Sequence, residues 1–175
     1  MSAKFVVADA GPLIALAVGG VLTKAIDMLG GIAVPEAVLQ ECIGDVSAPG
    51  AQLISEAAKR PGVELIPSSA LADFDSAFAH GLGSGEIAVL AYARQHNLLA
   101  LIDERRARRV AQRLQIAVIG SGAVLVQLKL RGRIGSVKPA LELWLQHGYF
   151  ISPAVERDIV LQAGELLDSK KLIGR

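Results

Sequence analysis

Phe5-Val6-Val7-Ala8-Asp9 is the stretch that decides the fold, because it is an apolar run of strand length that ends in an acid. A second stretch, Leu98-Leu99-Ala100-Leu101-Ile102-Asp103, has the same form. Short continuous apolar runs are typical of strands that are buried on both faces of a parallel sheet. The carboxyl ends of such strands meet at the sheet edge where ligands bind. We therefore expect Asp9 and Asp103 to lie at that edge.

Apolar runs of strand length alternate with helical patterns along the rest of the chain, which predicts a parallel sheet covered by helices on both faces. The predicted strands are 4–8, 32–34, 63–66, 98–102 and 117–119. The predicted helices are 12–18, 21–29, 35–43, 51–60, 84–96, 104–114, 123–130, 137–147 and 153–167. We expect one α/β domain over residues 1–175, in which about residues 135–175 form a C-terminal helical extension.

The composition is that of a folded chain with no global attraction to nucleic acid. Hydrophobic residues make up 52% of the 175 residues, charged residues 20%, and the net charge is +1. Any attraction to RNA must therefore come from local clusters of charge. The single cysteine, Cys42, excludes an internal disulfide framework and fits a reducing compartment. With no leader pattern and no apolar run of membrane-spanning length, the sequence predicts a cytoplasmic protein without a membrane partner.

Two glutamates fall on the apolar faces of predicted helices, where a carboxylate is costly. On a helical wheel Glu41 lies beside Val38 and Cys42, near a helix end where negative charge is unfavourable. Glu86 shares a face with Val89 and its apolar neighbours. Carboxylates on core-facing positions need a cation, a proton or hydrogen-bond donors.

Each acid other than Glu41 also has a simpler interpretation. Asp9 and Asp103 precede predicted helices and are candidates for N-caps. Glu86 falls in the first turn of its helix, where an acid suits the helix dipole. Taken together, however, four such acids in one small domain favour a shared divalent cation. Oxygen ligands without histidine or cysteine at ligand spacing favour Mg²⁺ or Mn²⁺ over Zn²⁺. The predicted metal-binding and catalytic residues are Asp9, Glu41, Glu86 and Asp103.

Arginines crowd the helix that follows Asp103. Arg105 and Arg108 lie near its start, where cations oppose the helix dipole, and both are close to Asp103 in sequence. Binding of substrate phosphate would explain both facts, whereas the alternative is a solvated face with a Glu104–Arg108 pair. The Gly120-Ser121-Gly122 turn after a predicted strand indicates an anion-binding turn.

The order of these motifs resembles that of PIN domains. The matching motifs are Asp9-Ala10-Gly11-Pro12-Leu13-Ile14, Glu41 late in a helix, Gly83-Ser84-Gly85-Glu86, and Leu101-Ile102-Asp103-Glu104-Arg105. The segment from Ile119 to Glu165 resembles one poorly characterised prokaryotic PIN-like subfamily. One departure is that Glu104 and Arg105 follow Asp103, where many PIN domains have another acid or a small polar residue slightly later.

The resemblance implies a three-layer α/β/α sandwich and metal-dependent ribonuclease activity. It also implies that Asp9, Glu41, Glu86 and Asp103 are the metal-binding acids. Many prokaryotic members of the family are VapC-type toxins of toxin–antitoxin pairs. The leading hypothesis is therefore an Mg²⁺- or Mn²⁺-dependent endoribonuclease that cleaves RNA, the toxin of such a pair, with an antitoxin protein as partner.

Two other interpretations are open. The chain is alternatively a catalytically weak or inactive PIN-fold module that binds protein or RNA. A flavodoxin-like phosphotransfer domain also gathers acids at strand ends, but no acid stands directly beside Asp9 and no lysine ends a late strand. The apolar residues near the C-terminus are expected either to cover the core or to form a homodimer; they are Leu141, Leu143, Trp144, Leu145, Tyr149 and Phe150.

Overall fold

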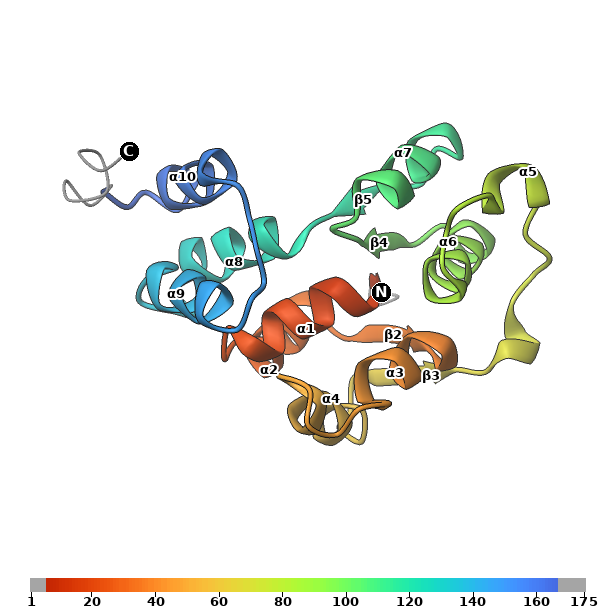
Figure 1. The fold of residues 1–175 in the computed structure, drawn as a ribbon, viewed down its shortest axis with the longest axis horizontal. Helices are drawn as coiled ribbons and strands as arrows, with labels where there is room; N and C mark the ends of the chain where they lie inside the picture. The colour runs from red at the N-terminus through yellow and green to blue at the C-terminus, as the bar shows by residue number, and fades with distance from the viewer. Residues whose placement is uncertain (1–5, 167–175) are drawn as a thin grey trace.

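The computed structural model describes residues 6–166 and places five parallel strands in one sheet (Figure 1). The strands are β1 Val6–Ala8, β2 Ile32–Pro35, β3 Val63–Ile66, β4 Leu99–Leu101 and β5 Val118–Ile119. Their order in the sheet is β3-β2-β1-β4-β5. In the centre, Val7 of β1 pairs with Ala33 of β2 on one side and with Ala100 of β4 on the other. The order of the strands therefore reverses between β1 and β4.

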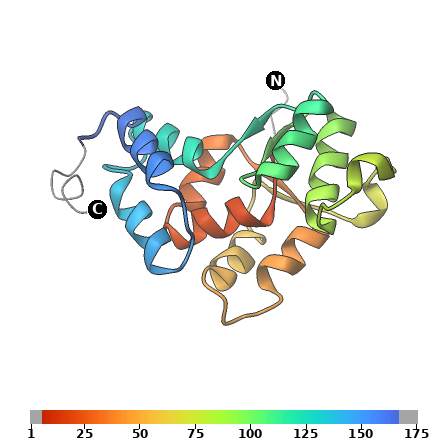
Figure 2. The same ribbon diagram turned by 45° about the horizontal axis from the view of Figure 1, so that its top comes forward.

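Helices cover both faces of this sheet (Figures 1 and 2). In the described part of the chain they are α1 Ala10–Val18, α2 Leu22–Leu29, α3 Glu36–Ile43, α4 Ala51–Ala57, α5 Ser76–Ala79, α6 Ser84–His96, α7 Arg105–Arg113, α8 Ser121–Leu130, α9 Lys138–Gln146 and α10 Pro153–Gln162. A short 3₁₀ turn, η1 Ser68–Ala70, follows β3. α6 packs on β1, β2 and β4, while α1, α2 and α4 contact one another and α8 contacts α1 and α2. The fold is the three-layer α/β/α sandwich that the sequence predicted.

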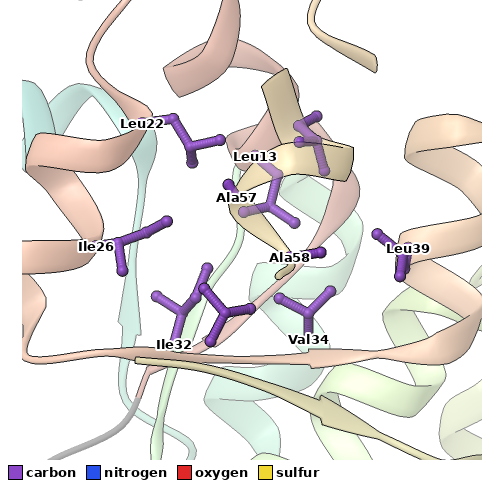
Figure 3. Close-up of a pocket in the computed structure, with 10 residues that line it drawn as sticks. Leu13, Leu22, Ile26, Ile32, Val34, Leu39, Ala57 and Ala58 are labelled. Atoms are coloured by element: carbon purple, nitrogen blue, oxygen red, sulfur yellow. The ribbon is translucent and has the colours of Figure 1, made fainter. Parts of the chain in front are cut away.

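Aliphatic side chains fill the layer between the sheet and helices α1, α2 and α4 (Figure 3). Ile32 and Val34 of β2 point toward Leu13 of α1 and Leu22 of α2. The cavity that these residues help to line measures only about 10 Å³. Such close packing holds β2 and the helices in a fixed relation, and so fixes the positions of the residues that follow them.

The C-terminal helices are anchored to the sandwich by buried contacts. α9 contacts α1, and α10 contacts α8. The side chain of Trp144 on α9 is fully buried, and its Nε1–H donates to the carbonyl oxygen of Ala15 over 2.6 Å. Glu165 accepts hydrogen bonds from the Ser136 hydroxyl (2.6 Å) and the Val137 amide (2.8 Å) beside the start of α9. The single-domain organisation over 1–175 remains a prediction, since residues 1–5 and 167–175 lie outside the described residues.

Most predicted elements are present, and the differences lie at their ends. β3 has the predicted bounds, whereas α4 ends three residues before position 60 and α10 ends at Gln162, ahead of the left-handed Gly164. The single-turn helix α5 was not predicted; Asp75 caps it by accepting a hydrogen bond from the amide of Ala77. Among residues 6–166 there is no helix with both the length and the apolar character that a membrane crossing needs.

Candidate active site

The two strand-end aspartates lie where the strand order reverses. Asp9 directly follows β1, and its amide donates to the carbonyl oxygen of Leu101 at the end of β4 (3.0 Å). Asp103 stands two residues beyond that carbonyl. This edge of an open parallel sheet is the usual place for a ligand. The sheet topology thus brings together two acids that are far apart in sequence.

The two glutamates reach the same edge from α3 and α6, which pack against each other. The point where a Cβ would stand on Gly85 lies 3.2 Å from Glu41 Oε2 and 3.8 Å from Asp9 Oδ1. Gly85 therefore leaves room for these two carboxylates. Glu86 is the next residue, and its Oε2 accepts a hydrogen bond from the amide of Gly83 over 2.7 Å, at the start of α6. The interpretation of Glu86 as a residue that stabilises its helix start is thus also correct.

Asp9 is the most buried of the four acids, with 6% of its surface exposed. Burial raises the pKa of its carboxyl from 3.8 to about 6, an effect that the Ala10 amide partly offsets and that Glu86, Glu41 and Asp103 increase. Asp9 occupies the N-cap position of α1, yet its side chain makes no capping hydrogen bond. The raised pKa reflects mainly the burial of this carboxyl, and the three neighbouring acids add to the effect.

Asp103 is half-buried, and each of its oxygens accepts a hydrogen bond from the protein. Oδ1 accepts from the amide of Ser121 over 2.8 Å, and Oδ2 accepts from the hydroxyl of Tyr149 over 2.6 Å. Asp103 is not an N-cap, because Glu104 holds that position in α7 and accepts from the amide of Ala107. Glu104 is thus engaged in its own helix, while Asp103 is held at the start of α8, where the helix dipole favours its charge.

The prediction that both glutamates face the core is wrong in its detail. Glu41 is exposed and Glu86 is half-buried. The reason is that α3 follows β2 directly and contacts α1, α4 and α6 at the open edge of the sheet, so part of its apolar face borders solvent. Among residues 6–166, no lysine or arginine forms an ion pair with any of the four acids.

One arginine of α7 lies next to the acidic edge. Arg108 Nη1 donates to the carbonyl oxygen of Ile102 (3.0 Å), which holds its guanidinium beside Asp103. The expected alternative, a Glu104–Arg108 ion pair, is not among the interactions of the described residues. Arg105 is exposed. An open depression next to β5 is lined by Arg108, Arg109, Gln112, Ile116 and Val118.

Sequence reasoning missed the two groups that hold Asp103. The Gly120-Ser121-Gly122 turn correctly indicated an anion site, but the anion that the Ser121 amide binds is the carboxylate of Asp103 itself. Tyr149 was placed only in the apolar C-terminal region. Its hydrogen bond to Asp103 joins residues 46 positions apart in the sequence, and no local sequence pattern predicts it.

The acids fit a hard divalent cation in donor chemistry and in charge. Asp9, Glu41, Glu86 and Asp103 supply only carboxylate oxygens, which Mg²⁺ and Mn²⁺ prefer. The chain's single thiol, Cys42, is not a competing ligand: burial, together with Glu41 and Asp9, raises its pKa to about 12. In the described part of the chain, no three Asp, Glu, His or Cys side chains are grouped closely enough to hold one ion as they stand.

A three-layer α/β/α sandwich that gathers acids at the reversal of strand order belongs to the open parallel-sheet proteins, which bind ligands at the carboxyl ends of their strands. A family model described as a PIN domain (DUF3368) matches residues 5–165, and the chain therefore belongs to the PIN domain family. PIN domains are generally nucleases and typically use divalent metals. No curated protein matches the chain.

Proposed function

We propose that this PIN domain is an Mg²⁺- or Mn²⁺-dependent endoribonuclease that hydrolyses phosphodiester bonds in RNA. The observation that carries the proposal is the meeting of four carboxylates, from β1, α3, α6 and the end of β4, at one sheet edge. Like charges that converge on one edge beside the buried Asp9 favour a bound counter-charge. Family membership supports a nuclease over other uses of such a site.

In this proposal Asp9, Glu41, Glu86 and Asp103 hold the cation, directly or through water. When bound, such an ion polarises a phosphodiester and lowers the pKa of an attacking water. Asp9 is buried and fixed by its backbone bond to β4, so it supplies a ligand in a defined place. Asp103 is fixed by two hydrogen bonds. No covalent intermediate with the protein is required.

Arg105 and Arg108 are the proposed phosphate-binding residues. The guanidinium of Arg108 lies beside Asp103, and its Nη1 donates to the carbonyl oxygen of Ile102. Of its five N–H donors, two would suffice for a bidentate contact with a phosphate in addition to that bond. Arg105 is exposed at the start of the same helix. The neighbouring depression that Arg108 and Arg109 line offers a path for the RNA backbone.

The activity is tested with purified protein and mixed RNA, in Mn²⁺ or Mg²⁺ and then with chelator. We expect cleavage that is lost with chelator and lost in Asp103→Asn. The matched control is Asp73→Asn, which changes an exposed aspartate on the segment before α5 and should cleave like the wild type. Cleavage that persists in both Asp9→Asn and Asp103→Asn would refute the assignment.

The second candidate is a PIN-fold module that binds RNA or protein with little or no catalysis. It is favoured by the engagement of both Asp103 oxygens in hydrogen bonds within the protein. A folded wild-type protein that binds RNA, takes up no Mn²⁺ in calorimetry and cleaves nothing would support this candidate over the nuclease.

We further propose that the protein acts in the cytoplasm as the toxin of a toxin–antitoxin pair, and that it forms a homodimer through its C-terminal helices. Leu141 and Trp144 belong to the core, whereas Phe150 (83% exposed) and Leu145 (39% exposed) are available to a second copy.

The toxin–antitoxin pairing is tested by co-expression of this chain with the product of a neighbouring small reading frame. Growth inhibition that the second product does not relieve would count against the pairing.

A further inference from the structure

Tyr149 brings the C-terminal part of the chain into the acidic site. Its hydroxyl donates to Asp103 Oδ2 over 2.6 Å, the length of a strong hydrogen bond to a carboxylate. The side chain is half-buried, and its hydroxyl is the donor of the pair because an ionised carboxylate can only accept.

The position of Tyr149 is fixed by α9 rather than by the acid it contacts. Its amide donates to the carbonyl oxygen of Trp144 over 2.8 Å, across a turn in which Gly148 has a φ of +76°. The Tyr149 ring lies against the indole of Trp144, with ring centroids 5.3 Å apart. Trp144 is itself bound to Ala15 in α1. The hydroxyl is thus aimed at Asp103 by a chain of contacts that begins in the core.

The effect on Asp103 follows from hydrogen-bond geometry. A carboxylate offers about four lone-pair positions, and the Ser121 amide and the Tyr149 hydroxyl use one on each oxygen. The remaining positions are free for a cation, and the two bonds prevent rotation of the carboxylate. Partners of this kind typically change metal affinity or activity by about 10–100-fold.

We propose that Tyr149 is a positioning residue, which orients the Asp103 carboxylate for the metal and makes the segment after α9 a required part of the site. The inference rests on the proposed function, because it assumes that Asp103 is a metal ligand. It assigns the C-terminal helices a role in the site itself, beyond covering the core or forming a dimer.

The first test is calorimetric titration of Mn²⁺ into the full chain as wild type, Tyr149→Phe and Tyr92→Phe. Tyr149→Phe keeps the ring against Trp144 and removes only the hydroxyl. Tyr92 is the other of the two tyrosines and lies on α6, so its substitution is the matched control. We expect Tyr149→Phe to bind Mn²⁺ about 10–100-fold more weakly, and Tyr92→Phe to bind it like the wild type.

The other results overturn the inference. Equal affinity in Tyr149→Phe, with or without a lower unfolding temperature of the metal-free protein, would reduce Tyr149 to a structural residue. Tighter binding in Tyr149→Phe would show that the hydroxyl competes with the metal instead of preparing its ligand.

A second measurement separates this inference from the proposed function. In Tyr92→Phe, Tyr149 is the single remaining tyrosine, and proton NMR should show one slowly exchanging hydroxyl resonance that shifts in the added Asp103→Asn variant. Its absence would refute the positioning role whatever the affinity for Mn²⁺. If the resonance is present and the wild type takes up no Mn²⁺, the metal-dependent nuclease is refuted, while the orientation of Asp103 by Tyr149 is supported.

Discussion

Asp9 shows most clearly how one residue can be unfavourable for stability and suited to a metal site. It is buried, it makes no capping hydrogen bond, and three other acids surround it. Burial and these neighbours make its charged form costly in the folded protein. A cation bound at the site would remove that cost.

The pH dependence of stability follows from this. The carboxyl of Asp9 has a pKa of about 6 when folded and near 3.8 when unfolded, so the folded state binds more protons between these values. Stability is therefore highest below pH 3.8 as far as this group is concerned, and falls as the pH rises through 6. In chelator we expect a loss of up to roughly 3 kcal/mol across this range. Urea unfolding at pH 4 and pH 7.5 measures it, with Mn²⁺ expected to reduce the difference.

The same argument predicts that Asp9→Asn stabilises the metal-free protein while it abolishes cleavage. The uncharged amide avoids the cost of burying a charge and the smaller repulsion from the other acids, so at pH 7.5 in chelator the free energy of unfolding should rise by about 1–3 kcal/mol. Unfolding of both proteins in urea, with and without Mn²⁺, checks the prediction. A variant that is less stable than the wild type in chelator would show that the charge of Asp9 is not costly in the folded protein.

Gly120 supplies a third prediction at the level of one residue. A Cβ at this position would stand 2.8 Å from Asp103 Oδ1 and 2.9 Å from Arg108 Nη1, although the backbone, at φ −105°, would tolerate any residue. Gly120→Ala should therefore displace Asp103 from the Ser121 amide and weaken Mn²⁺ binding about tenfold or more. Gly135→Ala is the control, because its Cβ would meet nothing within 4 Å. Unchanged affinity in Gly120→Ala would contradict the described position of Asp103.

At the level of single residues, the sequence predicts where the acids lie in the fold better than it predicts which residues contact them. The positions of Asp9 and Asp103 were predictable, because an acid that directly follows a buried parallel strand lies at the carboxyl edge of the sheet. The prediction that Glu41 faces the core was wrong, because a helical wheel cannot distinguish an apolar face in the core from one at the open edge of the sheet. Tyr149 was missed because its partner is set by tertiary packing alone.

At the scale of single elements, α7 begins with a charge arrangement that a nuclease site and a helix cap could both explain. Glu104 accepts from the amide of Ala107 over 2.8 Å and is the N-cap. Glu104→Ala should therefore lower the free energy of unfolding by about 1 kcal/mol and leave Mn²⁺ affinity unchanged. Calorimetry and urea unfolding measure the two effects, and a large loss of Mn²⁺ affinity would make Glu104 a fifth ligand.

Element bounds were predictable where one signal dominates. The stretch 63–66, apolar except for Glu64, stands between Pro-Gly and Pro-Ser turn residues, and the strand has the predicted bounds. The end of α10 was not predicted, because Gly164 in a left-handed conformation stops the helix inside a pattern that remains amphipathic. α5 has only four residues and depends on the Asp75 cap, which is too local a signal to separate from a loop.

For the whole molecule, the sequence predicted a parallel sheet with two helical layers, but it could not give the strand order β3-β2-β1-β4-β5. Alternation of strands and helices is compatible with several orders, and the order decides which strand ends become neighbours. Here it places β1 beside β4, and thereby Asp9 near Asp103.

Assembly is also a property of the whole molecule. If the C-terminal helices form a homodimer, Phe150→Ser should raise its dissociation constant, because Phe150 is 83% exposed and apolar. Sedimentation velocity of wild type and variant at micromolar concentration measures this. A wild type that sediments as a monomer throughout that range would rule out the dimer.

The central claim is that acids from four separate segments form one metal site. The most direct test is an anomalous difference map from crystals soaked in MnCl₂. The account predicts the strongest peak at the sheet edge, at bonding distance from the carboxylates of Asp9 and Asp103, and no such peak in Asp103→Asn. An empty edge in the soaked wild-type crystal, or a peak held by other residues, would contradict it.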